Sequence, residues 1–92
     1  MSLQFEWNDK KARLNKRKHK LTFEEASTIF GDPLSITISG TVHSFGEDRF
    51  ITIGTSINNK LIVVVHAGRD DIVRIISARK ATQNEKRHYE NE

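Results

Sequence analysis

Several charged side chains stand where they could bind phosphate or transfer protons. Arg74 lies between Val73 and Ile75, and an arginine in such an apolar segment is expected to reach a surface groove or a phosphate. Glu47 and Arg49 are two residues apart, which in a strand places both side chains on one face. They could act as a base and a phosphate clamp, or form an ordinary ion pair.

Three further candidates lie where predicted elements end. His19 titrates near neutral pH and could act as a general acid or base, or it could only cap a backbone carbonyl, and Lys18 beside it could bind phosphate. Arg79 lies where a strand meets a helix and could bind an anion or form a surface salt bridge. Arg74 and Arg79 are five residues apart, so a regular strand places them on opposite faces. They converge only if the strand ends before Arg79.

The segment from Lys10 to Lys20 carries a charge of +7, whereas the rest of the chain carries −4. Such a local field attracts polyanions, and nucleic acid is the obvious candidate. A solvated helix face or a landing site for an acidic protein fits the same pattern. In a helix, Lys11, Asn15 and Lys18 share a stripe with His19, which we expect to face a ligand while Ala12 and Leu14 dock the helix.

Length and composition exclude several classes of protein. The chain of 92 residues has room for one small domain over 1–92 and none for a Rossmann-size nucleotide fold. It contains no cysteine, so disulfides, thiolate metal sites and thiol nucleophiles are excluded. The histidines are scattered, which argues against a dedicated metal site, and no cofactor is expected. Without a long apolar run or a secretory segment, we expect a cytoplasmic protein that does not enter membranes.

The periodicity predicts an α+β domain. Asn8 can cap a helix from Asp9 to about Lys18, and capping boxes at Thr22 and Thr82 open two more helices. Between the second and third helices the period changes to two. We predict strands from Leu34 to Ser39, Arg49 to Ile57, Lys60 to Ala67 and Ile72 to about Ala78, with a loop from Thr41 to Asp48 and an edge strand from Leu3 to Glu6. The result is a small antiparallel sheet of about four to five strands, with two N-terminal helices and one C-terminal helix.

An ordered set of short motifs runs along the whole chain. The motifs are Phe5-x-Trp7, Lys11-x3-Asn15-x2-Lys18-His19, Phe23-Glu24-Glu25-Ala26, Glu47-x-Arg49, Arg74-Ile75-Ile76-Ser77-Ala78-Arg79-Lys80-Ala81-Thr82, Glu85 and Tyr89. Together they resemble the BrnT toxins. That family usually has Asp after the Trp and Gly after the Lys-His pair, where this chain has Asn8 and Lys20.

The resemblance implies the toxin half of a type II toxin–antitoxin pair, with a RelE-like fold and a ribonuclease activity that stops translation. Cleaving RNA without a metal needs a base for the ribose 2′-OH, cations for the phosphorane and an acid for the leaving 5′-oxygen. The chain offers each type. We predict the catalytic residues to be His19, Glu47, Arg49, Arg74 and Arg79. The predicted RNA contacts are Lys11, Asn15, Lys18 and Lys80, with no metal.

The partners implied by the resemblance are RNA and a BrnA-type antitoxin, in a possible dimer of toxin–antitoxin heterodimers. The alternative hypothesis is a non-catalytic module that binds nucleic acid or antitoxin on the same fold. Such a module would bind RNA in a salt-dependent way without cutting it. A third hypothesis, a structural adaptor whose basic helix contacts only protein, predicts no affinity for RNA.

Overall fold

A computed structural model describes residues 3–44 and 47–91, with side chains for residues 3–39 and 48–91. Along these residues the elements are β1 (Gln4–Trp7), α1 (Asp9–His19), α2 (Phe23–Ser27), the 3-10 helix η1 (Thr28–Gly31), β2 (Ile36–Ser44), β3 (Glu47–Thr55), β4 (Leu61–Ala67), β5 (Ile72–Lys80) and α3 (Gln83–Glu90). The strands form one sheet in the order β1-β5-β4-β3-β2. Strands β2 to β5 pair antiparallel, whereas β1 pairs parallel with β5. The predicted α+β class is confirmed, and the parallel edge strand makes the sheet mixed.

Local capping explains where the helices begin. Asn8 Oδ1 accepts a hydrogen bond from Lys11 N at 3.1 Å, and Thr22 Oγ1 accepts one from Glu25 N at 3.0 Å. The capping box at Thr82 is complete. After α1 the chain turns at Lys20, whose φ of 62° lies in the left-handed region that favours glycine. The N-caps predicted from sequence are therefore confirmed.

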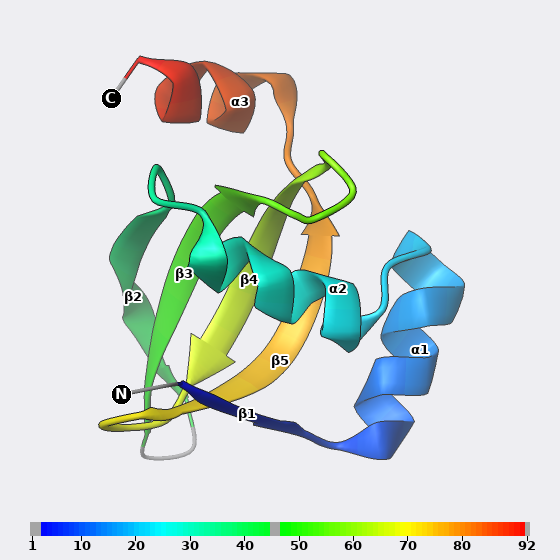
Figure 1. The fold of residues 1–92 in the computed structure, drawn as a ribbon. Coiled ribbons are helices and arrows are strands. Elements are labelled where there is room, and N and C mark those ends of the chain that lie inside the picture. The colour runs from blue at the N-terminus through cyan, green and yellow to red at the C-terminus, as the bar shows by residue number, and fades with distance from the viewer. Residues whose placement is uncertain (1–2, 45–46, 92) are drawn as a thin grey trace.

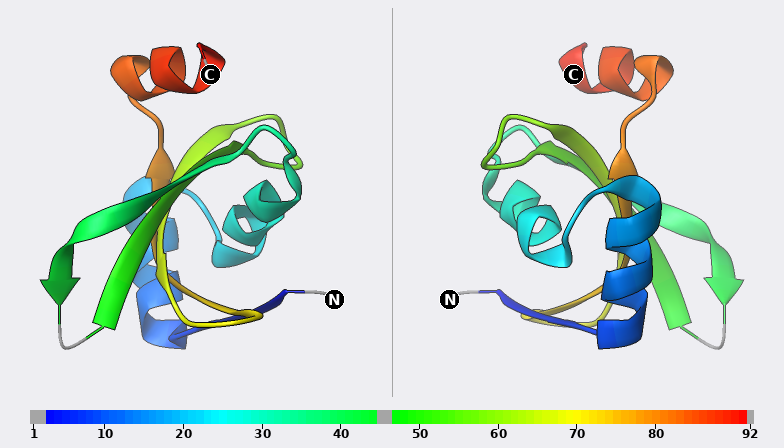
Figure 2. Two further views of the ribbon diagram at one scale, coloured as in Figure 1. Left: turned by 90° about the vertical axis from the view of Figure 1, so that its left-hand side faces the viewer. Right: turned by 90° about the vertical axis from the view of Figure 1, so that its right-hand side faces the viewer.

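The core lies between the sheet and the segment that contains α2 (Figure 1). α2 crosses β4 and β5 on one face of the sheet, and α1 lies along β5. The core residues are Leu21, Phe23, Ala26, Ile29, Ile62, Val64, Val73, Ile75 and Ala78. Two turned views show α2 on one side of the curved sheet (Figure 2). We call the other side, which α1 and α2 leave uncovered, the open face.

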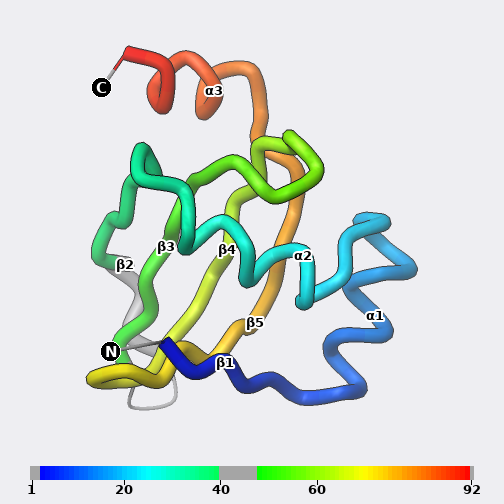
Figure 3. Tube along the Cα trace, in the orientation of Figure 1, coloured from blue at the N-terminus to red at the C-terminus, as the bar shows by residue number. Residues whose placement is uncertain are grey.

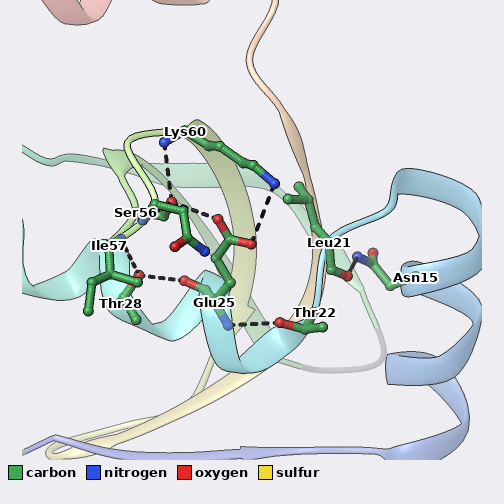
Figure 4. A network of polar contacts seen from close by, with 9 residues as sticks. Asn15, Leu21, Thr22, Glu25, Thr28, Ser56, Ile57 and Lys60 are labelled. Atoms are coloured by element: carbon green, nitrogen blue, oxygen red, sulfur yellow. Dashed lines mark hydrogen bonds and ion pairs between the residues drawn. The ribbon is translucent and has the colours of Figure 1, made fainter.

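A polar network joins α2 to the turn between β3 and β4 (Figure 4). Ser56 Oγ donates to Glu25 Oε2 at 2.8 Å, and the Lys60 ammonium lies 3.9 Å from Glu25 Oε1. Ile57 N donates to Thr28 Oγ1 at 3.0 Å. The Glu25 carboxylate therefore ties α2 to the sheet, in addition to the apolar contacts beneath it.

One predicted boundary was wrong. The predicted loop from Thr41 to Asp48 is largely strand, because β2 continues to Ser44 and β3 begins at Glu47, with Ser44 opposite Glu47. Pairing between the two strands overrides the local loop signal there. The second helix begins at Phe23 as predicted, is α-helical to Ser27 and continues as η1 to Gly31.

His66 of β4 is buried, with 8% of its surface exposed. Its Nε2 lies 2.7 Å from Thr52 Oγ1, which lies 2.8 Å from Thr37 Oγ1. The imidazole stacks on Phe50 and meets Phe30 edge-on. Burial lowers the pKa of His66 below its ordinary 6.5, since the charged form loses hydration.

We predict that this buried imidazole makes the protein less stable as pH falls from 7 to 5. The unfolded chain binds a proton near pH 6.5 that the folded His66 accepts only at lower pH, so the free energy of unfolding decreases below 6.5. The slope is limited to about 1.4 kcal/mol per pH unit for one proton. Asp32 and Glu85 have lowered pKa values and lose their contributions only in more acidic solution. Urea unfolding at several pH values tests this, and a His66→Gln variant with the same slope between pH 7 and 5 would contradict it.

Candidate active site

An irregularity in β5 brings two predicted site residues to the same face of the sheet. Ser77 lies opposite Val65 and Ile75 opposite His66, so Ile76 is an extra residue in β5. Such a bulge shifts the alternation by one residue, and side chains on either side of it share a face when they are an odd number apart. Arg74 and Arg79 satisfy this condition.

The core composition fixes which face the two arginines occupy. Val73, Ile75 and Ala78 of β5 belong to the core on the helix-covered face. Arg74 and Arg79, which alternate with them, therefore lie on the open face. The expectation that the two converge only if the strand ends before Arg79 was wrong, because β5 continues to Lys80. Their positions opposite Ala67 and Val63 are four residues apart on β4, which is about 13 Å.

Arg49 joins Arg74 at one end of the open face. Phe50 lies opposite His66, so the antiparallel register places Arg49 beside Ala67, and Ala67 lies opposite Arg74. The two arginines thus flank one alanine, with Cα atoms two strand spacings apart, or about 10 Å. Both long side chains can reach a single phosphate from this distance.

The buried Nε of Arg49 has no hydrogen-bond acceptor among the described side chains. Leaving a buried donor unpaired costs about 1–3 kcal/mol. Glu47, predicted as its partner, begins β3, but its side chain lies outside the described residues. The Arg49 guanidinium is therefore the better-defined half of the predicted pair.

Arg79 forms the salt bridge that the sequence left as its alternative role. Its Nη1 and Nη2 donate to the two carboxylate oxygens of Glu85, each at 2.8 Å. This fork lowers the pKa of Glu85 to about 2 and raises that of Arg79. The pair connects the end of β5 to the first turn of α3.

The other predicted residues lie along α1 and at the end of β5. Lys11 and Lys18 are exposed and His19 is half-buried. Lys80 is exposed and lies opposite Ile62 on the helix-covered face, away from Arg79. The predicted open stripe was wrong in its orientation, because Asn15 and His19 share the side of α1 that faces the protein. Leu14, expected to dock the helix, is 51% exposed.

Asn15 is buried, with 7% of its surface exposed. Its Nδ2 donates to Leu21 O at 3.2 Å (Figure 4), and its Oδ1 accepts a hydrogen bond from Ala78 N at 3.0 Å. β1 pairs with β5 only as far as Ile75, so Asn15 supplies the acceptor that the strand edge needs further along. The predicted RNA contact does not fit a side chain held this way.

A protein-family model matches residues 7–85, which is most of the chain. It describes the ribonuclease toxin, BrnT, of type II toxin–antitoxin systems. The chain belongs to the BrnT family. The fold agrees with a solved member: the crystal structure of the Brucella abortus ribonuclease toxin BrnT has a TM-score of 0.68 at 20% identity, covering 89% of this chain and 100% of that one. A search of curated protein sequences found no match.

Two further findings concern membrane-spanning helices and metal sites. In residues 3–44 and 47–91, no helix is long and apolar enough to cross a membrane. In the same residues, no group of three or more His, Asp or Glu side chains is arranged to hold a metal ion. The functional groups that the structure does gather on the open face are arginines.

Asn15 is expected to stabilise this BrnT fold strongly. In Asn15→Ala the buried N–H of Ala78 loses its acceptor, and the expected loss is about 1–3 kcal/mol in the free energy of unfolding. Lys16→Ala, at the exposed next position of α1, is the matched control and should change it by less than about 0.5 kcal/mol. Chemical denaturation measures the free energy of unfolding of both variants. Equal losses would show that the hydrogen bonds of the Asn15 side chain contribute little.

α3 is attached to the BrnT sheet at a second point, through Tyr89, whose contact with Asp32 the motifs did not predict. Tyr89 Oη donates to Asp32 Oδ2 at 2.6 Å, and the same oxygen accepts from Thr55 N at 2.9 Å. Burial raises the pKa of Asp32, but the hydrogen bonds from Tyr89 and the backbone outweigh it and leave the pKa lowered. α3 lies beyond the end of the sheet (Figure 3), so these contacts hold it at the Arg79 end of the open face. The Asp32-Pro33 turn was the available sequence signal.

Proposed function

We propose that this toxin cleaves RNA on the open face by a metal-independent transesterification. The observation that carries the proposal is the bulge in β5, which places Arg74 and Arg79 on one face with Arg49 beside Arg74. An RNA strand crossing this face meets a cationic group at each end.

The proposed reaction uses the RNA's own nucleophile. A base takes the proton of the 2′-OH, the 2′-oxygen attacks phosphorus, and the bond to the 5′-oxygen breaks as an acid protonates that oxygen. The products are a 2′,3′-cyclic phosphate and a 5′-hydroxyl. Arg49 and Arg74 would stabilise the additional negative charge on the phosphorane. Glu47 and His19 remain the proposed proton-transfer groups, and Lys11 and Lys18 the proposed backbone contacts. Lys80 lies on the helix-covered face, so it would meet only RNA that extends past the edge of the open face.

The biological setting is part of the same proposal. Cleavage of cellular RNA would stop translation in the cytoplasm, and a BrnA-type antitoxin would neutralise the toxin, in a possible dimer of heterodimers. The arginines of the open face support an acidic partner. Co-expression followed by size-exclusion chromatography with light scattering tests the complex and its stoichiometry.

Cleavage of a labelled RNA by the purified toxin in excess EDTA tests the reaction. We expect cutting to persist, with products that end in a 2′,3′-cyclic phosphate. RNA that is bound in a salt-dependent way but stays intact would favour the non-catalytic module instead. Activity abolished by EDTA and restored by a divalent metal would contradict the metal-independent mechanism.

A further inference from the structure

The outer side of α1 carries a second cationic surface, separate from the open face. Arg13, Lys16, Arg17 and Lys20 line a shallow hollow of about 430 Å³. All four side chains are exposed, and among the described residues none of them pairs with an acid. We call these four residues the outer basic surface.

Helix geometry separates this surface from the groups used for catalysis. Asn15 and His19 face the protein, and Asn15 contacts β5 through Ala78. Arg13 and Arg17 follow one another at a spacing of one turn on the opposite side of α1. The surface therefore points away from β5 and cannot contact the same phosphate as Arg49 and Arg74.

The composition of the hollow favours phosphates over an acidic protein. Protein interfaces have apolar and aromatic residues at their centre and are depleted in lysine. Among the described residues, only arginine and lysine side chains line this hollow, and these are the usual phosphate-binding groups. Since none of these lining side chains is aromatic or an amide, none of them would read bases.

We propose that the outer basic surface binds the phosphate backbone of the RNA segment flanking the one on the open face, independently of sequence. This inference rests on the proposed function, because it assigns a second contact to the same substrate. It predicts that the toxin holds long RNA more tightly than short RNA. A substrate of a few nucleotides would occupy the open face alone.

The test compares two triple variants that remove the same charge from different places. Arg13→Gln, Lys16→Gln and Arg17→Gln change the outer basic surface and keep Lys20 in its left-handed turn. The matched control replaces the exposed cations Arg69, Lys86 and Arg87 with glutamine. Glutamine suits exposed helix positions nearly as well as lysine or arginine, and thermal unfolding confirms that both proteins fold.

Binding is measured by fluorescence anisotropy with a 2′-O-methyl RNA of about 30 nucleotides, which lacks the nucleophile. The outer-surface variant should lose at least about tenfold in affinity at 0.1 M salt, and the slope of log K against log salt should fall by about 2, as for three single-strand phosphate contacts. The control should lose no more than about twofold. Both variants should cleave a tetranucleotide at the wild-type rate.

Three outcomes would overturn the inference. They are equal losses in both variants, no loss in the outer-surface variant, or a loss of polyglutamate binding while RNA binding is kept. The last result would identify a surface for acidic protein. The 2′-O-methyl probe measures binding alone, because it cannot be cut. Failure of the proposed cleavage would be seen in a separate assay, in which an all-ribose RNA stays intact with the wild type and with both variants.

Discussion

Replacing Arg74 with alanine should lower kcat/KM for RNA cleavage by about 100-fold or more. Arg74 and Arg49 flank Ala67 on the open face, where their guanidinium groups can share the charge that develops on one phosphate. Removing one preorganised donor of this kind costs about 100- to 1,000-fold in other enzymes. Initial rates with a short fluorogenic RNA measure the effect, and wild-type binding of a 2′-O-methyl analogue would place the loss in the transition state.

Matched variants separate this effect from a general loss of charge. Arg74→Lys keeps the charge but lacks the planar fork, so a smaller loss is expected. Arg69→Ala removes an exposed arginine from the turn between β4 and β5 and should leave the rate within about twofold of wild type. If Arg74→Ala and Arg69→Ala cut at the same rate, Arg74 has no catalytic role.

The Arg79→Ala variant should differ from Arg74→Ala, because Arg79 also holds α3. Its guanidinium is already shared with Glu85, so part of what Arg79→Ala removes is the attachment of α3. The Glu85 carboxylate competes with any phosphate at that end of the open face.

Local sequence signals predicted the start of each helix and the type of fold. Asn8, Thr22 and Thr82 each cap a helix through contacts within three residues, and such signals need no tertiary information. The strand predicted from Lys60 to Ala67 is β4, the middle strand of the sheet. The resemblance to the BrnT toxins added the family, which a match over residues 7–85 then showed.

The arrangement of the site depends on contacts that the sequence pattern does not encode. The extra residue at Ile76 exists only in the pairing of β5 with β4, and without it Arg74 and Arg79 have opposite parity. Asn15 looked like a surface residue because its neighbours are basic, whereas its amide completes the hydrogen bonding of β5. The burial of a polar residue among lysines can be recognised only once the packing of its helix against the sheet is known.

Phe23→Ala should have the largest effect on stability, because Phe23 is fully buried at the start of α2. Its ring meets Trp7 edge-on with centroids 5.9 Å apart, so the substitution leaves a cavity and removes an aromatic pair. The expected loss is about 3–5 kcal/mol, a large share of the 5–15 kcal/mol typical of a domain.

Chemical denaturation of Phe23→Ala measures this loss, with Phe23→Leu and Ile57→Ala as matched controls. Leucine keeps most of the volume and should cost less. Ile57 is 77% exposed, so its replacement should change the free energy of unfolding by less than about 0.5 kcal/mol. Because α2 covers the face opposite the arginines, RNA cleavage by Phe23→Ala should be lost on warming before that of the wild type. A Phe23→Ala protein as stable as Ile57→Ala would mean that α2 does not hold the sheet.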